Sequence, residues 1–105
     1  MLSKKHRLPI QEFFKNGRAK IIRGKYFIIK TRLSNLPFSR FGAIVSAAKV
    51  SKSAVKRNKI KRTFFNFIRL NKHHLKPGKD TLIIFSPLVS KLVKKEIENE
   101  LEKLL

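Results

Sequence analysis

The longest stretch of this chain without a carboxylate runs for 67 residues, from Phe13 to Lys79, and it constrains the fold more than any other feature. The stretch carries 19 of the 26 lysine and arginine residues in a chain of 105 residues. Cations inside this stretch have no acidic partner nearby in the sequence, so the fold has to place most of them on the protein surface. Because solvated protein surfaces usually mix both signs of charge, the stretch predicts a polyanionic partner, nucleic acid before an anionic membrane.

The composition of the whole chain narrows the class of protein. A formal net charge of +20 on a small domain repels itself and attracts polyanions. Nine Phe and 42% hydrophobic residues suffice for one modest core, so we expect one domain over residues 1–105. The absence of Cys excludes a disulfide scaffold, a zinc site with Cys ligands and a thiol nucleophile. Neither a membrane span nor a secretory signal is recognisable, and we expect a cytoplasmic protein with no membrane partner.

Hydrophobic periodicity and turn signals predict helices and strands in the order α-β-β-β-α-β-α. The expected helices cover residues 9–15, 51 or 53 to 73 or 74, and 88–104, and the expected strands cover 18–22, 25–33, 40–47 and 81–85. This order is typical of the α+β class: a two-layer sandwich in which helices pack on one four-stranded sheet.

The long central helix is expected to have two different halves. Its first half contains five cations within the seven residues from Lys56 to Arg62, and Asn58 adds a group that can contact a base edge or a ribose. A stripe at helical spacing in and after this half is expected to face the core, namely Ile60, Phe64, Phe67 and Ile68. The last helix is expected to bury a similar stripe, namely Val89, Val93, Ile97, Leu101 and Leu104. On these grounds alone, the sequence does not distinguish an RNA-binding helix from a generic basic helix.

Side chains for protein-based catalysis are scarce. Four of the six acids, Glu96, Glu98, Glu100 and Glu102, are spaced by two and would spread around a helix. The neighbours His73 and His74 would point about 100° apart on a helix and lack a third ligand. No glycine-rich phosphate loop is present. The sequence therefore predicts a binding protein without catalytic residues, a metal site or a bound cofactor.

Several motifs resemble the bacterial ribonuclease P protein component. Its signature helix commonly reads Arg-Asn-Arg-Ile-Lys-Arg, and this chain has Arg57-Asn58-Lys59-Ile60-Lys61-Arg62. Phe14-Lys15-Asn16-Gly17, the strand from Gly42 to Ser46 and Asp80-Thr81-Leu82-Ile83-Ile84 resemble further pieces of the family in the same order. The resemblance extends from about Lys5 to Leu104. It implies an unusual left-handed β-α-β crossover through the signature helix, against the general right-handed rule.

The resemblance also implies a function. The family's protein pairs with ribonuclease P RNA, as a 1:1 complex, and assists the Mg²⁺-dependent endonucleolytic removal of the 5′ leader from precursor tRNA. The RNA holds the Mg²⁺ and breaks the bond. Residues implied to bind the catalytic RNA are Lys49, Lys52, Lys56, Arg57, Asn58, Lys59, Lys61 and Arg62. Residues implied to line a cleft for the single-stranded leader are Ile10, Phe14, Tyr26, Ile28 and Lys30.

Two of these leader residues depart from the family pattern, because Ile10 and Lys30 stand where many members have an aromatic side chain.

The main alternative to this family is a structural RNA-binding protein, such as a ribosomal protein of similar sandwich fold. A DNA-binding helix-turn-helix would need a short helix before its recognition helix, where a strand is expected here. A protein-only nuclease would need convergent carboxylates.

Overall fold

The computed structural model describes residues 4–15, 19–46 and 52–105, with the side chains of Glu12, Phe14 and Lys15 outside the description. The α-β-β-β-α-β-α order expected from the sequence is confirmed, with three short 3-10 helices (η) added. In chain order the elements are η1 (Lys4–His6), α1 (Ile10–Lys15), β1 (Lys20–Arg23), β2 (Phe27–Leu33), β3 (Arg40–Ile44), α2 (Ala54–Leu70), η2 (His73–Leu75), β4 (Lys79–Phe85), η3 (Pro87–Lys91) and α3 (Lys94–Leu104).

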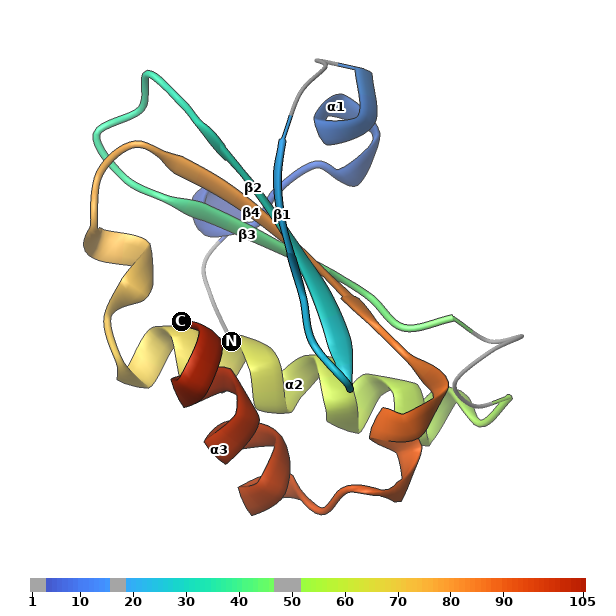
Figure 1. Cartoon of the computed structure of the whole chain (residues 1–105). Coiled ribbons are helices and arrows are strands. Elements are labelled where there is room, and N and C mark those ends of the chain that lie inside the picture. Colours follow the sequence, from blue (N-terminus) through green and yellow to red (C-terminus); the bar gives the residue numbers. More distant parts are fainter. Residues whose placement is uncertain (1–3, 16–18, 47–51) are drawn as a thin grey trace.

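The four strands form one mixed sheet in the order β1-β2-β4-β3. β2 pairs antiparallel with both β1 and β4, whereas β3 and β4 are parallel. Parallel neighbours need a crossover, and α2 provides it by running back beneath the sheet from the end of β3 toward the start of β4 (Figure 1). Followed in that direction the connection is left-handed, as the family resemblance implied.

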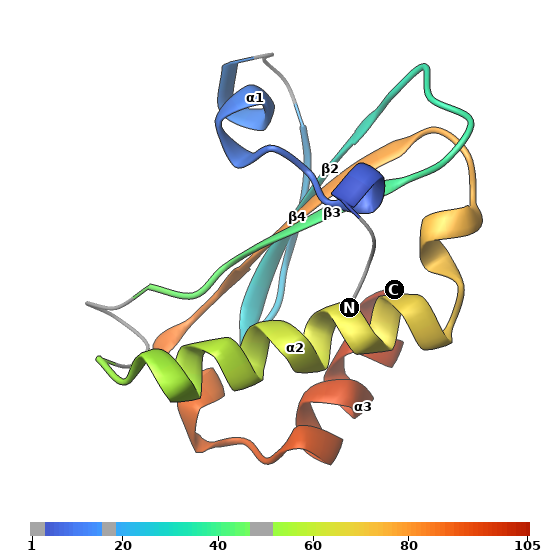
Figure 2. The ribbon, with the colours of Figure 1, turned by 180° about the vertical axis from the view of Figure 1, so that it is seen from behind.

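Helices lie on both faces of this sheet. α2 and α3 cover one face, and η1 and α1 lie over part of the other (Figures 1 and 2). β4 is apolar on both sides because it lies inside the sheet: Ile83 and Phe85 join the core under α2 and α3, and Leu82 joins a smaller cluster with Leu8 and Phe13 under α1. The predicted core stripe of α2 is confirmed, since Ile60, Phe64, Phe67 and Ile68 are all buried.

The long helix ends earlier than expected. Asn71 caps α2 by donating from its side-chain amide to the Phe67 carbonyl at 2.9 Å. Lys72 then adopts a left-handed conformation with φ of 57°, which ends a right-handed helix and separates η2 from α2. At the other end, the cap is Ser53, which is one of the two starts expected for this helix; the other expected start, Ser51, lies outside the described residues.

The prediction of one continuous helix from 88 to 104 was wrong. η3 ends at Lys91, Leu92 and Val93 are extended, and α3 begins at Lys94. The Val93 backbone N–H donates to the Glu96 carboxylate at 3.0 Å, a capping arrangement that stabilises a new helix start. The break also splits the predicted stripe, because Val89 is fully buried while Val93 is 63% exposed.

Candidate RNA interface

The basic half of α2 begins at a well-formed cap. The Ser53 hydroxyl accepts a hydrogen bond from the Lys56 backbone N–H at 3.2 Å, which satisfies one donor of the first turn. The cations that follow therefore project from a regular helix and not from a loop. Lys52, Lys56, Asn58, Lys59 and Arg62 are exposed and Arg57 and Lys61 are half-buried, whereas Lys49 lies outside the described residues.

Charge and helix geometry oppose each other in this half of α2. The partial positive charge of a helix N-terminus disfavours neighbouring cations, yet its first turn contains no acid and its first nine residues contain five cations. The ion pairs found among the described residues do not include Lys56, Lys59, Lys61 or Arg62. A helix start that gathers cations with no acid among them is suited to an external anion, and helix N-termini bind phosphate readily.

The α1 side of the sheet brings together three of the five predicted leader residues. Ile28 pairs with Ile84 and Lys30 pairs with Leu82, so both point to the face that α1 partly covers. Ile10 packs against the same small cluster from α1. All three predicted residues are half-buried, so together they offer aliphatic surface beside the Lys30 cation.

The other two predicted leader residues stand apart. Tyr26 precedes β2 and packs against the main core cluster, while the Lys25 ammonium lies 5.6 Å from its ring centre. The backbone of Phe14 belongs to α1, but its side chain lies outside the described residues. A leader contact by either aromatic residue stays a prediction.

The sequence analysis missed an ion cluster that fastens α1 to the sheet. Asp80 on β4 is 1% exposed, and Arg40 on β3 donates to both of its carboxylate oxygens, at 3.0 and 2.8 Å. Arg32 on β2 approaches the same carboxylate at 3.5 Å. It also donates to the Phe13 carbonyl at 3.1 Å and lies over the Phe13 ring at 4.8 Å. An isolated acid beside an acid-free stretch of 67 residues was the available signal.

The two neighbouring histidines of η2 have separate surroundings. His73 stacks on Phe67 with 5.8 Å between ring centres, and burial, followed by the charge of Lys76 and then His74, lowers the pKa of His73. His74 packs edge-on against the buried His6 ring at 4.8 Å, and among the described residues its buried Nδ1 has no hydrogen-bond partner. No three His, Asp or Glu side chains converge as metal ligands in the described ranges.

These features define a class: a small, strongly basic α+β protein whose sheet supports one cation-rich helix, as in proteins that bind RNA. A family model described as ribonuclease P matches residues 2–105. The chain therefore belongs to the ribonuclease P protein component family, the protein subunits of a ribonucleoprotein endoribonuclease in tRNA processing, whose partner is ribonuclease P RNA. None of the helices in the described ranges combines the length and apolarity needed to cross a bilayer.

Individual relatives agree with this membership. A ribonuclease P protein component of Syntrophus aciditrophicus is 38% identical over 81 residues, which make up 77% of this chain and 66% of that protein, just under two thirds of its length. One of Pseudanabaena is 34% identical over 108 residues, covering 100% of this chain and 92% of that protein.

Solved structures of the family share the fold. The RNase P protein of Staphylococcus aureus superimposes with a TM-score of 0.79 at 25% identity, covering 93% of this chain and 90% of that chain. The RNase P protein of Thermotoga maritima gives 0.77 at 26% identity, covering 94% of each chain. The strand order and the helix order described above are those of this family.

Proposed function

We propose that this chain binds ribonuclease P RNA through the first half of α2 and holds the 5′ leader of precursor tRNA on the α1 side of the sheet. In this role it assists endonucleolytic removal of the leader in the cytoplasm, as one protein per RNA. The observation that carries the proposal is the set of five cations at the start of α2, with no acid among the first nine residues of the helix. A generic solvated helix would place acids among them.

The proposed contact with the catalytic RNA is mainly electrostatic. Exposed Lys52, Lys56, Lys59 and Arg62 can each approach a phosphate, and the dipole of α2 adds to their attraction. Each phosphate that the protein neutralises releases counterions, so about six to ten contacts would make binding steeply dependent on salt. Asn58 is exposed on the same half of the helix and can pair with a base edge or a ribose.

The proposed leader contact needs little sequence selectivity. The half-buried side chains of Ile10 and Ile28 supply apolar surface for bases, and Lys30 supplies a charge for the backbone. Every base has an apolar face, so such a surface accepts leaders of varied sequence. The Arg32–Asp80 contact supports this face indirectly, because Arg32 holds α1 through the Phe13 carbonyl.

Bond cleavage is assigned to the RNA in this proposal. Catalytic metal sites in nucleases use convergent carboxylates, and the described residues contain no group of three potential ligands. Asp80, the one acid on the sheet in these ranges, is buried between two arginines. The protein would bind and orient the substrate, and the Mg²⁺ ions would be held by RNA phosphates.

The first test is cleavage of a precursor tRNA by a bacterial ribonuclease P RNA at low Mg²⁺, with and without this protein. We expect cleavage at the mature 5′ end only when both components are present. A folded protein that gives no stimulation with a cognate RNA would contradict the proposal and favour a structural RNA-binding protein.

Variants then separate the two surfaces. Arg57→Ala and Arg62→Ala should weaken assembly with ribonuclease P RNA, whereas Lys95→Ala on α3, which removes an exposed cation outside the proposed interface, should not. Ile28→Ala and Phe14→Ala should weaken binding of precursor tRNA but not of mature tRNA, which has no leader. Equal losses for both tRNAs would remove these residues from the leader site.

A further inference from the structure

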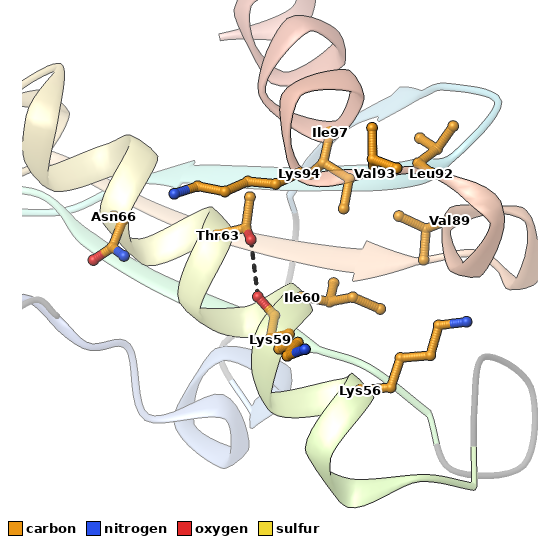
Figure 3. A pocket seen from close by; sticks show the side chains of 10 residues that line it. All are labelled: Lys56, Lys59, Ile60, Thr63, Asn66, Val89, Leu92, Val93, Lys94 and Ile97. Carbon is orange, nitrogen blue, oxygen red and sulfur yellow. Dashed lines mark hydrogen bonds between the residues drawn. The ribbon is translucent and has the colours of Figure 1, made fainter.

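A groove of about 380 Å³ separates α2 from the η3–α3 connection (Figure 3). Its floor consists of Ile60, Val89 and Ile97, which are 5% exposed or less. Val93 lies at its mouth and is 63% exposed, because the helix break after Lys91 turns it out of the core. The volume lies within the range of about 300–1,000 Å³ that is usual for small-molecule sites.

The rim of this groove is positively charged. Lys56 and Lys59 reach it from α2, and Lys94 reaches it from the start of α3. In Figure 3 the Lys56 side chain extends below Val89 at one end, and Lys94 extends across the other end toward α2. All three are exposed, and none takes part in an ion pair found among the described residues.

The described residues that line the groove include no acid. The neighbouring carboxylate of Glu96 accepts from the Val93 backbone N–H and so caps α3. The Thr63 hydroxyl beside the floor donates to the Lys59 carbonyl at 2.9 Å. In Figure 3 the Asn66 amide points away from Val93 and Ile97, so the floor itself is apolar.

We propose that this groove binds one unstacked nucleotide of the partner RNA, with the base inserted against Val93 and Ile97 and the adjoining phosphates held by the rim lysines. The inference rests on the proposed function, since Lys56 and Lys59 belong to the same cationic half of α2. An apolar slot fits the face of a base, and lysines at both ends of the slot fit the phosphates on either side of that base. The groove thus continues the α2 surface as far as α3.

Chemistry distinguishes this occupant from two others. A fatty acid would use the apolar floor, but its single carboxylate would reach the lysines at one end only. An acidic peptide would use the lysines, but the carboxylate side chains that pair with them offer no planar face to the apolar floor. The nucleotide is the occupant that uses the floor and the lysines at both ends together.

The probe is a single-stranded RNA pentamer of adenylates, compared with the same pentamer carrying an abasic ribose at its centre. Both have the same charge, so their difference reports the base. Methyl NMR of Val93 and Ile97 in the full chain should show saturable shifts with the complete pentamer. Binding read at Ile97 should be about tenfold weaker with the abasic pentamer, in line with the worth of one base contact.

Two matched pairs of variants locate the effect. Val93→Glu and Leu70→Glu each place one acid at an exposed aliphatic position, just before α3 and at the end of α2, but Leu70 is outside the groove. Lys94→Gln and Lys95→Gln each remove one exposed cation of α3, and Lys95 is outside the groove. Val93→Glu should abolish the difference between the two pentamers, and Lys94→Gln should weaken both pentamers, while the controls keep wild-type behaviour.

The outcomes separate this inference from the proposed function. Equal binding of the two pentamers at Ile97, or a response of that methyl group to an acidic peptide or a fatty acid and not to RNA, would overturn the groove assignment. Stimulation of ribonuclease P RNA by the wild-type protein tests the function independently. If Val93→Glu and Leu70→Glu stimulate equally, the function stands and the groove assignment falls.

Discussion

Replacing Asp80 by Asn removes the negative charge at the centre of the Arg32–Asp80–Arg40 cluster while keeping nearly the same shape. Asp80 is 1% exposed, and its two oxygens receive the paired hydrogen bonds from Arg40. In the variant, two cations from different strands face each other across a neutral amide. We expect the protein to lose stability and α1 to loosen, because Arg32 also holds the Phe13 carbonyl.

The size of the loss follows from burial. Removing one partner of a buried ion pair typically costs about 3–5 kcal/mol, because the remaining charge loses its compensation. The side chains of Arg32 and Arg40 are 13% and 21% exposed, so water can partly solvate them after the change. We therefore expect the lower end, about 3 kcal/mol, in the free energy of unfolding. For a domain of this size that corresponds to a fall in Tm of roughly 12–24 °C.

Urea unfolding followed by circular dichroism measures this loss at constant salt. The matched control is Glu100→Gln, which breaks the exposed Lys103–Glu100 pair at 3.3 Å and should cost less than about 0.5 kcal/mol. The double variant Asp80→Asn/Arg40→Met should lose less than the sum of the single variants, because the second change removes a stranded cation.

A loss below about 1 kcal/mol for Asp80→Asn, equal to an exposed pair, would refute the reasoning that this cluster holds the sheet together. A loss of the expected size with unchanged affinity for precursor tRNA would keep the stability argument and refute the link from Arg32 through α1 to the leader surface.

Two further predictions concern packing and pH. A Cβ atom at Gly42 would lie 3.3 Å from the Leu8 Cβ and 3.4 Å from Leu82 Cδ1. Gly42→Ala should therefore lower the free energy of unfolding, measured in urea, by about 1–3 kcal/mol. An unchanged unfolding midpoint would show that η1 and α1 can shift without cost. Burial and Lys76 hold the pKa of His73 below its ordinary value of 6.5, so the folded protein binds its proton less readily than the unfolded chain. His73 should therefore contribute its full stability above pH 6.5 and lose it as the pH falls below that value, and His73→Gln should flatten this part of the stability profile.

Local patterns in the sequence were sufficient to predict the order of the elements and the basic first half of α2. Alternation and helical spacing depend on neighbours within a few residues, so the core stripe from Ile60 to Ile68 and the apolar β4 could be predicted before any tertiary contact was known. The cap at Ser53 could also be predicted as one of two choices. The chain's charge distribution likewise determined that the first half of α2 would carry five cations with no acid among them in the sequence.

The interruption at Leu92 and Val93 could not be predicted from the same patterns. The apolar residues between 88 and 104 recur at helical spacing, as they do in many continuous helices. Val89 is instead buried from a 3-10 turn that closes the core below β4, and Glu96 then caps a second start. The choice between one helix and two was made by packing against α2, which no local window contains.

The arrangement of the candidate sites was decided by tertiary structure, because each site joins residues that are distant in the chain. Strand register alone brings Arg32 and Arg40 to Asp80, and the packing of α3 against α2 brings Lys56 and Lys94 to the two ends of one groove. The sequence by itself determined that this protein would carry many cations on a small α+β fold. The tertiary structure decided which cations Asp80 neutralises, because the strand register places Arg32 and Arg40 within reach of its buried carboxylate.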